Sequence, residues 1–207
     1  MTPSGLPIIM NSTVETSPIM TLDPAQSPRS TAPAIKGEKL RSAMRAWTAG
    51  VTIVTAAYNG SRHGMTVNSF ASISLDPPWI TISLQQAART HELVLKASAF
   101  GITILSAEQK YLSDRFARRM QAQSPRSAAS AVQGESEDRF KGLVIESLVT
   151  GAPFIKGGLA YLDCRLVQTI SAGMNTLFIG EVVAALAAGQ GQPLIYHNRK
   201  YWRLTDI

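Results

Sequence analysis

The chain has almost none of the residues that build covalent cross-links or metal centres. Cys164 is the single cysteine in 207 residues, which excludes an internal disulfide and a cysteine-rich metal site. The three histidines, His63, His91 and His197, are far apart and show neither the HxH nor the HExxH spacing of metal ligands. We therefore expect no metal, and we interpret Cys164 as a buried, inert thiol.

Several motifs of common enzymes are also missing. The sequence has no GxGxxG that opens a helix after a strand, no P-loop pattern and no GxSxG elbow, so a Rossmann site, a P-loop and a serine hydrolase are not supported. Asp163 and Glu181 each interrupt an apolar strand-like run, and we interpret both as charges at a barrel rim that face water. The sequence thus predicts no catalytic acid, base or nucleophile.

Long apolar runs and a leader pattern are absent as well. No apolar segment reaches the roughly 18 residues that a membrane-spanning helix needs. The N-terminus lacks a basic segment followed by an apolar one. We expect a cytoplasmic protein that does not enter a membrane.

The charge balance is basic, with 20 Lys and Arg against 14 Asp and Glu and a net charge of +6. Basic residues cluster only around 115–126 and 199–203, which we interpret as solvated surface. A barrel that binds single-stranded nucleic acid would interleave aromatic residues with the basic ones, and these are missing. We expect no nucleic-acid partner, although the same field would favour a phosphate-bearing ligand.

Composition divides the chain into two parts. Residues 1–36 hold six of the eleven prolines and have no periodic apolar face, so we predict a disordered N-terminal extension. The pattern becomes periodic after that, and we predict one folded domain over residues 37–207. Further methionines at Met10, Met20 and Met44 leave the true start of translation open.

Short β-branched segments dominate the folded part and predict strands that turn back on one another. We expect strands over 51–57, 64–75, 79–84, 100–105, 158–171 and 175–187, with a hairpin made by 193–197 and 201–204. Three short helices are expected over 38–47, 90–98 and 106–119, and a polar surface loop over 124–138. Asn59-Gly60 and Asn198-Arg199 mark tight turns. The sequence therefore predicts a mainly β fold, an antiparallel barrel with short peripheral helices.

The stretch 64–75 is unusual because it carries no charge over twelve residues. Read with a period of two, its odd positions form a mostly apolar face and its even positions a neutral polar face of Thr66, Asn68, Phe70, Ser72 and Ser74. Two interpretations fit this pattern. The short donors and acceptors suit a flat, uncharged polar ligand, or they belong to a Ser/Thr-rich barrel strand whose side chains are satisfied internally.

A second candidate lies one strand later, where Arg89 precedes Thr90 at the start of the helix over 90–98. We expect Thr90 to cap this helix. A helix N-terminus offers free N–H groups and partial positive charge, and an arginine adds a charge-assisted contact, so the loop fits a phosphate. An ordinary capped helix explains the same residues. Together, the two stretches match a planar polar ring system that ends in a phosphate, which is the outline of a flavin nucleotide.

The order of these segments resembles the flavin reductase family, the split β-barrel flavin-binding proteins that act as reductase components of two-component monooxygenases. The resemblance extends over roughly residues 40–205, and its most specific segment is 64–84. It is carried by AGVTIVT (49–55), GMTVNSFASISLDPPWITISL (64–84), RTHELVLKASAFGITILS (89–106), EQKYLSDRFA (108–117), NTLFIGEV (175–182) and PLIYHNRKYWRL (193–204).

The resemblance implies a homodimer that binds FMN or FAD, reduces it with NADH or NADPH, and supplies the reduced flavin to a partner monooxygenase. It assigns the flavin ring and ribityl chain to Thr66, Val67, Asn68 and Ser69, with Ser72 and Ser74 continuing that contact. It assigns the phosphate to Arg89 and Thr90, the shape of the pocket to Phe116, and the nicotinamide side to Asn175, His197 and Tyr201.

One position departs from the family pattern. Many relatives have Gly-Asp-His before the strand at 175–182, whereas this chain has Gly173-Met174-Asn175. Asn175 can donate and accept hydrogen bonds but cannot carry the charge of an imidazole, so the departure bears on the nicotinamide rather than on flavin binding. It leaves a second hypothesis beside the reductase, namely a flavin-binding module without efficient NAD(P)H turnover that serves storage or redox sensing.

Overall fold

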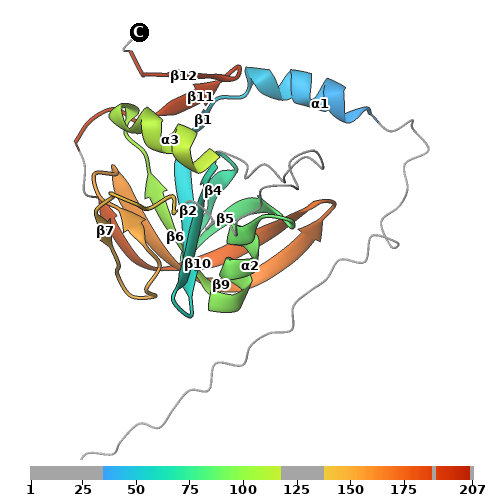
Figure 1. The fold of residues 1–207 in the computed structure, drawn as a ribbon. Helices are drawn as coiled ribbons and strands as arrows, with labels where there is room; N and C mark the ends of the chain where they lie inside the picture. Colours follow the sequence, from blue (N-terminus) through green and yellow to red (C-terminus); the bar gives the residue numbers. More distant parts are fainter. Residues whose placement is uncertain (1–34, 118–137, 188–189, 206–207) are drawn as a thin grey trace, which may run out of the picture.

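Seven antiparallel strands form the main sheet of the computed structural model, which describes residues 35–117, 138–187 and 190–205 (Figure 1). They follow the order β3-β2-β6-β9-β10-β5-β4 across the sheet, and each neighbouring pair is antiparallel. The strands are β2 (Thr52–Tyr58), β3 (Ser61–Val67), β4 (Phe70–Leu75), β5 (Pro78–Gln85), β6 (Ala99–Ile104), β9 (Ala160–Ala172) and β10 (Asn175–Ala187). The predicted mainly β, antiparallel fold is confirmed.

The two edge strands of this sheet are neighbours in the sequence. β3 ends at Val67 and β4 begins at Phe70, so only Asn68 and Ser69 connect them. Three Cα–Cα steps span at most about 11 Å, and the sheet must therefore curl until its edges approach each other. The Ser69 hydroxyl donates to the carbonyl of Ser83 on β5 at 2.9 Å, which ties this junction to the strand beside β4. The barrel is consequently split between β3 and β4, which do not pair.

The single strand predicted over 64–75 is wrong at this junction. Because the chain changes edge at Asn68-Ser69, the inward and outward faces exchange, and Phe70 packs on the barrel core. Ile73 and Leu75, predicted to face inward, are 49% and 89% exposed. A bulge between Ser72 and Ser74 shifts the register of β4 against β5 once more.

Both predicted hairpin turns are confirmed. Asn59 and Gly60 have φ angles of 46° and 76°, and Asn198 and Arg199 have φ angles of 46° and 62°. Positive φ at both central residues is the requirement of a type I′ turn, whose twist matches that of the flanking strands. The turns join β2 to β3 and β11 (Ile195–His197) to β12 (Lys200–Trp202).

Short elements flank the barrel. The helices are α1 (Gly37–Ala43), η1 (Met44–Ala46), α2 (Arg89–Ala97), η2 (Ala107–Gln109) and α3 (Lys110–Ala117). The minor strands are β1 (Ala49–Gly50), β11 (Ile195–His197) and β12 (Lys200–Trp202) in one sheet, and β7 (Ile145–Glu146) and β8 (Phe154–Ile155) in another. Figure 1 shows α3 over one end of the barrel and α1 standing apart from it. The predicted capping box at Ser106 and Gln109 is present at η2.

Two apolar clusters hold these layers together. The first fills the barrel and includes Val54, Ile82 and Phe178, with Leu93 and Val94 of α2 packed into it. The second lies under α3 and includes Ile53 and Phe116. β2 is therefore buried on both faces, which explains its continuous β-branched sequence.

Asp163 corrects the prediction that it lies at a rim and faces water. Its side chain is fully buried on β9, where Oδ2 accepts the backbone N–H groups of Val149 at 2.6 Å and Thr150 at 2.8 Å. Oδ1 accepts the Thr150 hydroxyl. The carboxylate thus holds the loop before β8, because an unpaired buried charge would be costly. Glu181 pairs with Arg165 at 3.6 Å on the surface.

Three predictions fall on other parts of the chain. The predicted N-terminal extension lies outside the described residues except for residues 35 and 36. The same holds for the predicted loop over 124–138, except for residue 138, and for the last two residues of the helix predicted over 106–119. Within the described ranges, the helices are all too short or too polar to cross a bilayer.

Candidate functional site

A cavity of about 880 Å³ opens beside the split of the barrel. Its walls come from the end of β3, the junction after it, the loop from β5 into α2, α3, the turn between β9 and β10, and β12. Nine of the residues predicted to bind cofactors line it: Thr66, Val67, Asn68, Ser69, Arg89, Thr90, Phe116, Asn175 and Tyr201.

The wall at the split is polar but uncharged. Val67 is buried, whereas Asn68 and Ser69 are exposed at the junction between the two sheet edges. The Thr66 hydroxyl donates to the carbonyl of Ser113 on α3 at 2.7 Å, so this side chain fixes the helix against the strand. Backbone and side-chain dipoles gather here because the strands stop pairing, and they suit a neutral ligand with several polar edges.

Another part of the cavity lining is basic, and we call it the basic end. Arg89 begins α2 and Arg139 lies beside β3, where its guanidinium donates to the carbonyls of Gly64 and Phe116, both at 3.0 Å. His63 is half-buried between them, and burial, then Arg139, then Arg89 lower its pKa from 6.5 to about 4. The imidazole is therefore neutral near pH 7, and the positive charge at this end belongs to the two arginines.

Thr90 does not cap its helix as predicted. The N-cap of α2 is Ala88, whose methyl group cannot accept a hydrogen bond from the first turn. Thr90 is instead fully buried in that turn, with Oγ1 2.7 Å from Nδ1 of His63. No side chain therefore caps the first turn of α2, and Arg89 and Thr90 of that turn line the cavity, where the helix N-terminus contributes partial positive charge.

The turn between β9 and β10 forms a third wall. Gly173 adopts φ +62°, and the next residues, Met174 and Asn175, line the cavity. Gln86 holds this turn, because its N–H donates to the Met174 carbonyl at 3.0 Å and its Nε2 donates to the Asn175 carbonyl at 3.3 Å. Met174 is 83% exposed, so its thioether stands at the mouth of the cavity.

A fourth wall joins α3 to the C-terminal hairpin. Oη of Tyr201 lies 2.8 Å from Oγ of Ser113, and burial raises the pKa of Tyr201. The ammonium of Lys110 lies 5.1 Å from the Tyr201 ring centroid. Phe116 packs edge-on against Phe140 at 5.2 Å, which fixes the ring at the cavity floor.

Three predicted residues lie elsewhere. Ser72 and Ser74 lie farther along β4, past the junction, and do not line the cavity. His197 does not line it either, and its Nδ1 lies 3.0 Å from Oγ1 of Thr48. The period-two reading assumed that one strand face continued through residue 74, whereas the junction ends that face at residue 69.

Other lining residues were missed by sequence reasoning, in particular His63, Ser113 and Arg139. Each reaches the cavity through a tertiary contact, so no local pattern points to it. Among the described residues, no group of histidine, cysteine and carboxylate side chains could hold a metal ion. Cys164 is buried as predicted, and burial raises its pKa to about 12.

The fold is a split barrel, and its cavity is lined by an uncharged polar wall and by arginine side chains. The family model described as "Flavin reductase like domain" matches residues 44–205, and the chain belongs to this family. It is 38% identical over 165 residues to the FMN reductase (NADH) SmoA of Agrobacterium fabrum, covering 80% of this chain and 84% of that protein.

Two further similar proteins are also reductase components by name. The chain is 33% identical over 172 residues to the reductase component of an FADH(2)-dependent resorcinol hydroxylase from a Rhizobium species, covering 82% and 88% of the two chains. Among solved structures, it superposes on BorF, the flavin reductase component of a bacterial two-component tryptophan halogenase, with a TM-score of 0.70 and 30% identity. That match covers 83% of this chain and all of BorF.

Proposed function

We propose that this protein is an NAD(P)H-dependent flavin reductase that supplies reduced FMN or FAD to a partner monooxygenase. Its relatives include an FMN reductase that uses NADH and reductase components of a hydroxylase and a halogenase. The observation that carries the proposal is the cavity of about 880 Å³, which joins an uncharged polar wall to a basic end. These names and this cavity do not favour the alternative of a flavin-binding module without turnover.

The donor set fits a flavin nucleotide. The wall around Thr66, Asn68 and Ser69 offers neutral donors and acceptors to the polar edge of an isoalloxazine ring. Arg89 and the N-terminus of α2 offer positive charge to a phosphate. When bound, the flavin supplies a ring that accepts a hydride from the nicotinamide.

The residues of the chain act by position and electrostatics. Gln86 fixes the turn that carries Asn175, so that the amide of Asn175 stands ready to orient a nicotinamide at the cavity mouth. Phe116 and Tyr201 line the cavity on the side of α3 and β12 and exclude water there. No side chain has to take or give a proton for a hydride transfer, which agrees with the absence of a charged pair on the wall at Thr66–Ser69.

A matched pair of variants tests the binding site. Asn68→Ala removes an amide from the cavity wall and should raise the Kd for flavin by about tenfold, the size of one hydrogen bond in a partly open site. Ser72→Ala removes a hydroxyl three residues past Ser69, the last residue of this stretch that lines the cavity, and should leave the Kd unchanged. Equal Kd values for both variants and the parent protein, measured by quenching of flavin fluorescence, would remove the site from this wall.

Turnover tests the activity itself. Purified protein mixed with NADH or NADPH and excess FAD or FMN should oxidise the nucleotide only when flavin is present. Retention of flavin without oxidation of either nucleotide would instead favour the binding module.

We further propose that the protein acts as a cytoplasmic homodimer. The edge strand β4 presents Ile73 and Leu75 to solvent, and an exposed apolar edge strand is a surface that proteins normally cover. Helix α1 buries no residue of its own, and Trp47 after η1 is 67% exposed. A second copy of the chain is the proposed cover. Leu75→Glu should shift the sedimentation mass from dimer to monomer, whereas a monomeric parent protein would overturn the proposal.

A further inference from the structure

A second cavity of about 460 Å³ adjoins the first, and three residues line both. His63, Arg89 and Arg139 line both cavities, so the basic end of the first cavity also borders the second. This volume lies within the range of about 300–1,000 Å³ found for small-molecule pockets. A ligand whose phosphate lies at the shared wall could therefore extend a further group beyond it.

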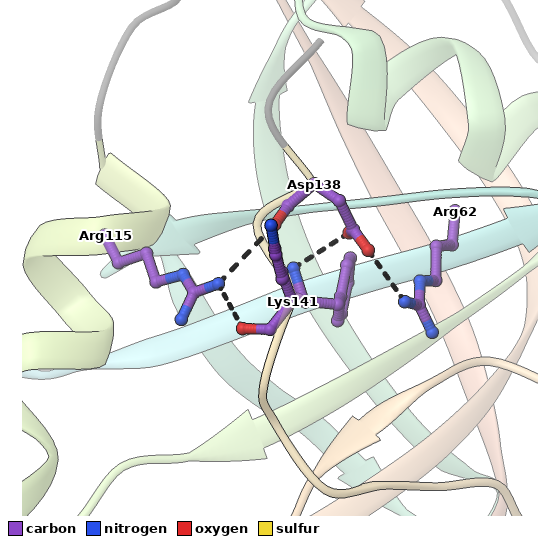
Figure 2. A network of polar contacts seen from close by, with 5 residues as sticks. Arg62, Arg115, Asp138 and Lys141 are labelled. Carbon is purple, nitrogen blue, oxygen red and sulfur yellow. Dashed lines mark hydrogen bonds and ion pairs between the residues drawn. The ribbon is translucent and has the colours of Figure 1, made fainter. Parts of the chain in front are cut away.

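The rest of the lining of the second cavity comes from the turn between β2 and β3 with Arg62, and from Asp138 and Phe140. Arg62 of β3 donates to Asp138 Oδ2 at 2.9 Å (Figure 2). Its guanidinium carbon lies 4.9 Å from the ring centroid of Phe140. Asp138 Oδ1 accepts the Phe140 N–H at 2.9 Å. These bonds arrange the wall before any ligand arrives.

Helix α3 supports the same wall from the other side. The guanidinium of Arg115 donates to the Lys141 carbonyl at 2.7 Å and to the Asp138 carbonyl at 3.5 Å (Figure 2). The second cavity thus has three arginines and one carboxylate among its lining residues, and its net charge is positive. Arginine guanidinium groups both pair with phosphates and stack on aromatic rings.

The shared basic wall separates two spaces, so the matching ligand has phosphates in its middle and a ring system at each end. We propose that the second cavity binds the adenosine diphosphate portion of FAD, and that the protein consequently prefers FAD to FMN. This inference rests on the proposed function, because it takes the first cavity as the site of the flavin ring.

Binding titrations of the apoprotein with FAD and FMN test the assignment. The parent protein should bind FAD at least about tenfold more tightly than FMN, the effect of one or more charge-assisted contacts in a partly open site. Arg62→Ala should raise the Kd for FAD by about tenfold and leave the Kd for FMN unchanged. Arg165→Ala is the matched control, since Arg165 is also an exposed, ion-paired arginine on a strand and lines neither cavity.

A second variant guards against a fold defect in Arg62→Ala. Ser61→Trp adds a bulky side chain to the lining of the second cavity and should weaken FAD binding selectively. Equal Kd values for FAD and FMN in the parent protein, or an equal loss of both in the variants, would overturn the inference. It would also be overturned if the variants changed only the KM for NADH, because the cavity would then serve the nicotinamide dinucleotide. Brisk NADH oxidation with equal use of FMN and FAD would leave the proposed function intact.

Discussion

His63 gives the basic end of the cavity a measurable pH dependence. Its pKa is about 4 in the folded protein, because burial and the neighbouring Arg139 and Arg89 oppose its charging, whereas the ordinary value is 6.5. As the pH falls, the unfolded chain therefore takes up a proton first, and folding stability is lost between about pH 6.5 and pH 4. Below that window the loss levels off, since both states are protonated.

The size of the effect follows from the same two values. Between about pH 7.5 and pH 5, the full difference in proton affinity would remove about 2 kcal/mol from the free energy of unfolding. The imidazole is half-exposed, and solvent screening reduces this to about 1 kcal/mol. Phosphate or flavin must be absent, because an anion between the arginines would raise the pKa of His63.

Urea denaturation of the parent protein and of His63→Asn at these two pH values isolates the contribution of His63 to the pH dependence of the free energy of unfolding. Titrations of other groups, including His91, are common to both proteins and cancel in the difference. The parent protein should lose about 1 kcal/mol more than the variant on acidification. An NMR titration of the His63 ring should show a midpoint well below 6.5. Equal losses in the two proteins, or a midpoint near 6.5, would refute the account of this end of the cavity.

Three further substitutions test separate parts of the structure. Asp163→Ala should lower the free energy of unfolding by about 2–4 kcal/mol in urea, because it removes the acceptor of three hydrogen bonds, whereas the exposed Asp114→Ala should cost under about 1 kcal/mol. Gly180→Ala should lower the free energy of unfolding by about 1–3 kcal/mol, because a Cβ there would lie 2.6 Å from a core phenylalanine ring. A Cβ at Gly50 would meet no atom within 4 Å, so Gly50→Ala should change the midpoint of urea unfolding little. Asn175→His should raise the rate of NADH oxidation at saturating flavin if this position faces the nicotinamide, and an unchanged rate would remove it from that role.

The local parts of the fold could be predicted from the sequence. The Asn-Gly turn at residues 59–60 and the β-branched run of β2 are specified by neighbouring residues, and the strand predicted at 175–187 has the bounds of β10. The break at Asn68-Ser69 could not be predicted, because it is imposed by closure of the sheet between β3 and β4. The outward turn of Leu75 follows from that closure.

The same distinction separates the predicted and the missed parts of the site. The uncharged wall and the Arg89 loop are each a continuous segment of the sequence, so the chemistry of each could be recognised as a local pattern. The role of Arg139 depends on carbonyls of Gly64 and Phe116, which are distant in sequence. Asp163 was misread because its partners, Val149 and Thr150, lie on a separate loop.

The central claim is that this cavity brings a nicotinamide and a flavin together for hydride transfer. The most direct test is to mix a catalytic amount of the protein with NADH and free flavin under anaerobic conditions. The absorbance bands of NADH and of oxidised flavin are followed during the reaction. The account predicts equimolar loss of NADH and oxidised flavin, and a slower rate in Asn68→Ala at subsaturating flavin. Loss of NADH without loss of oxidised flavin, or no loss of either, would contradict it.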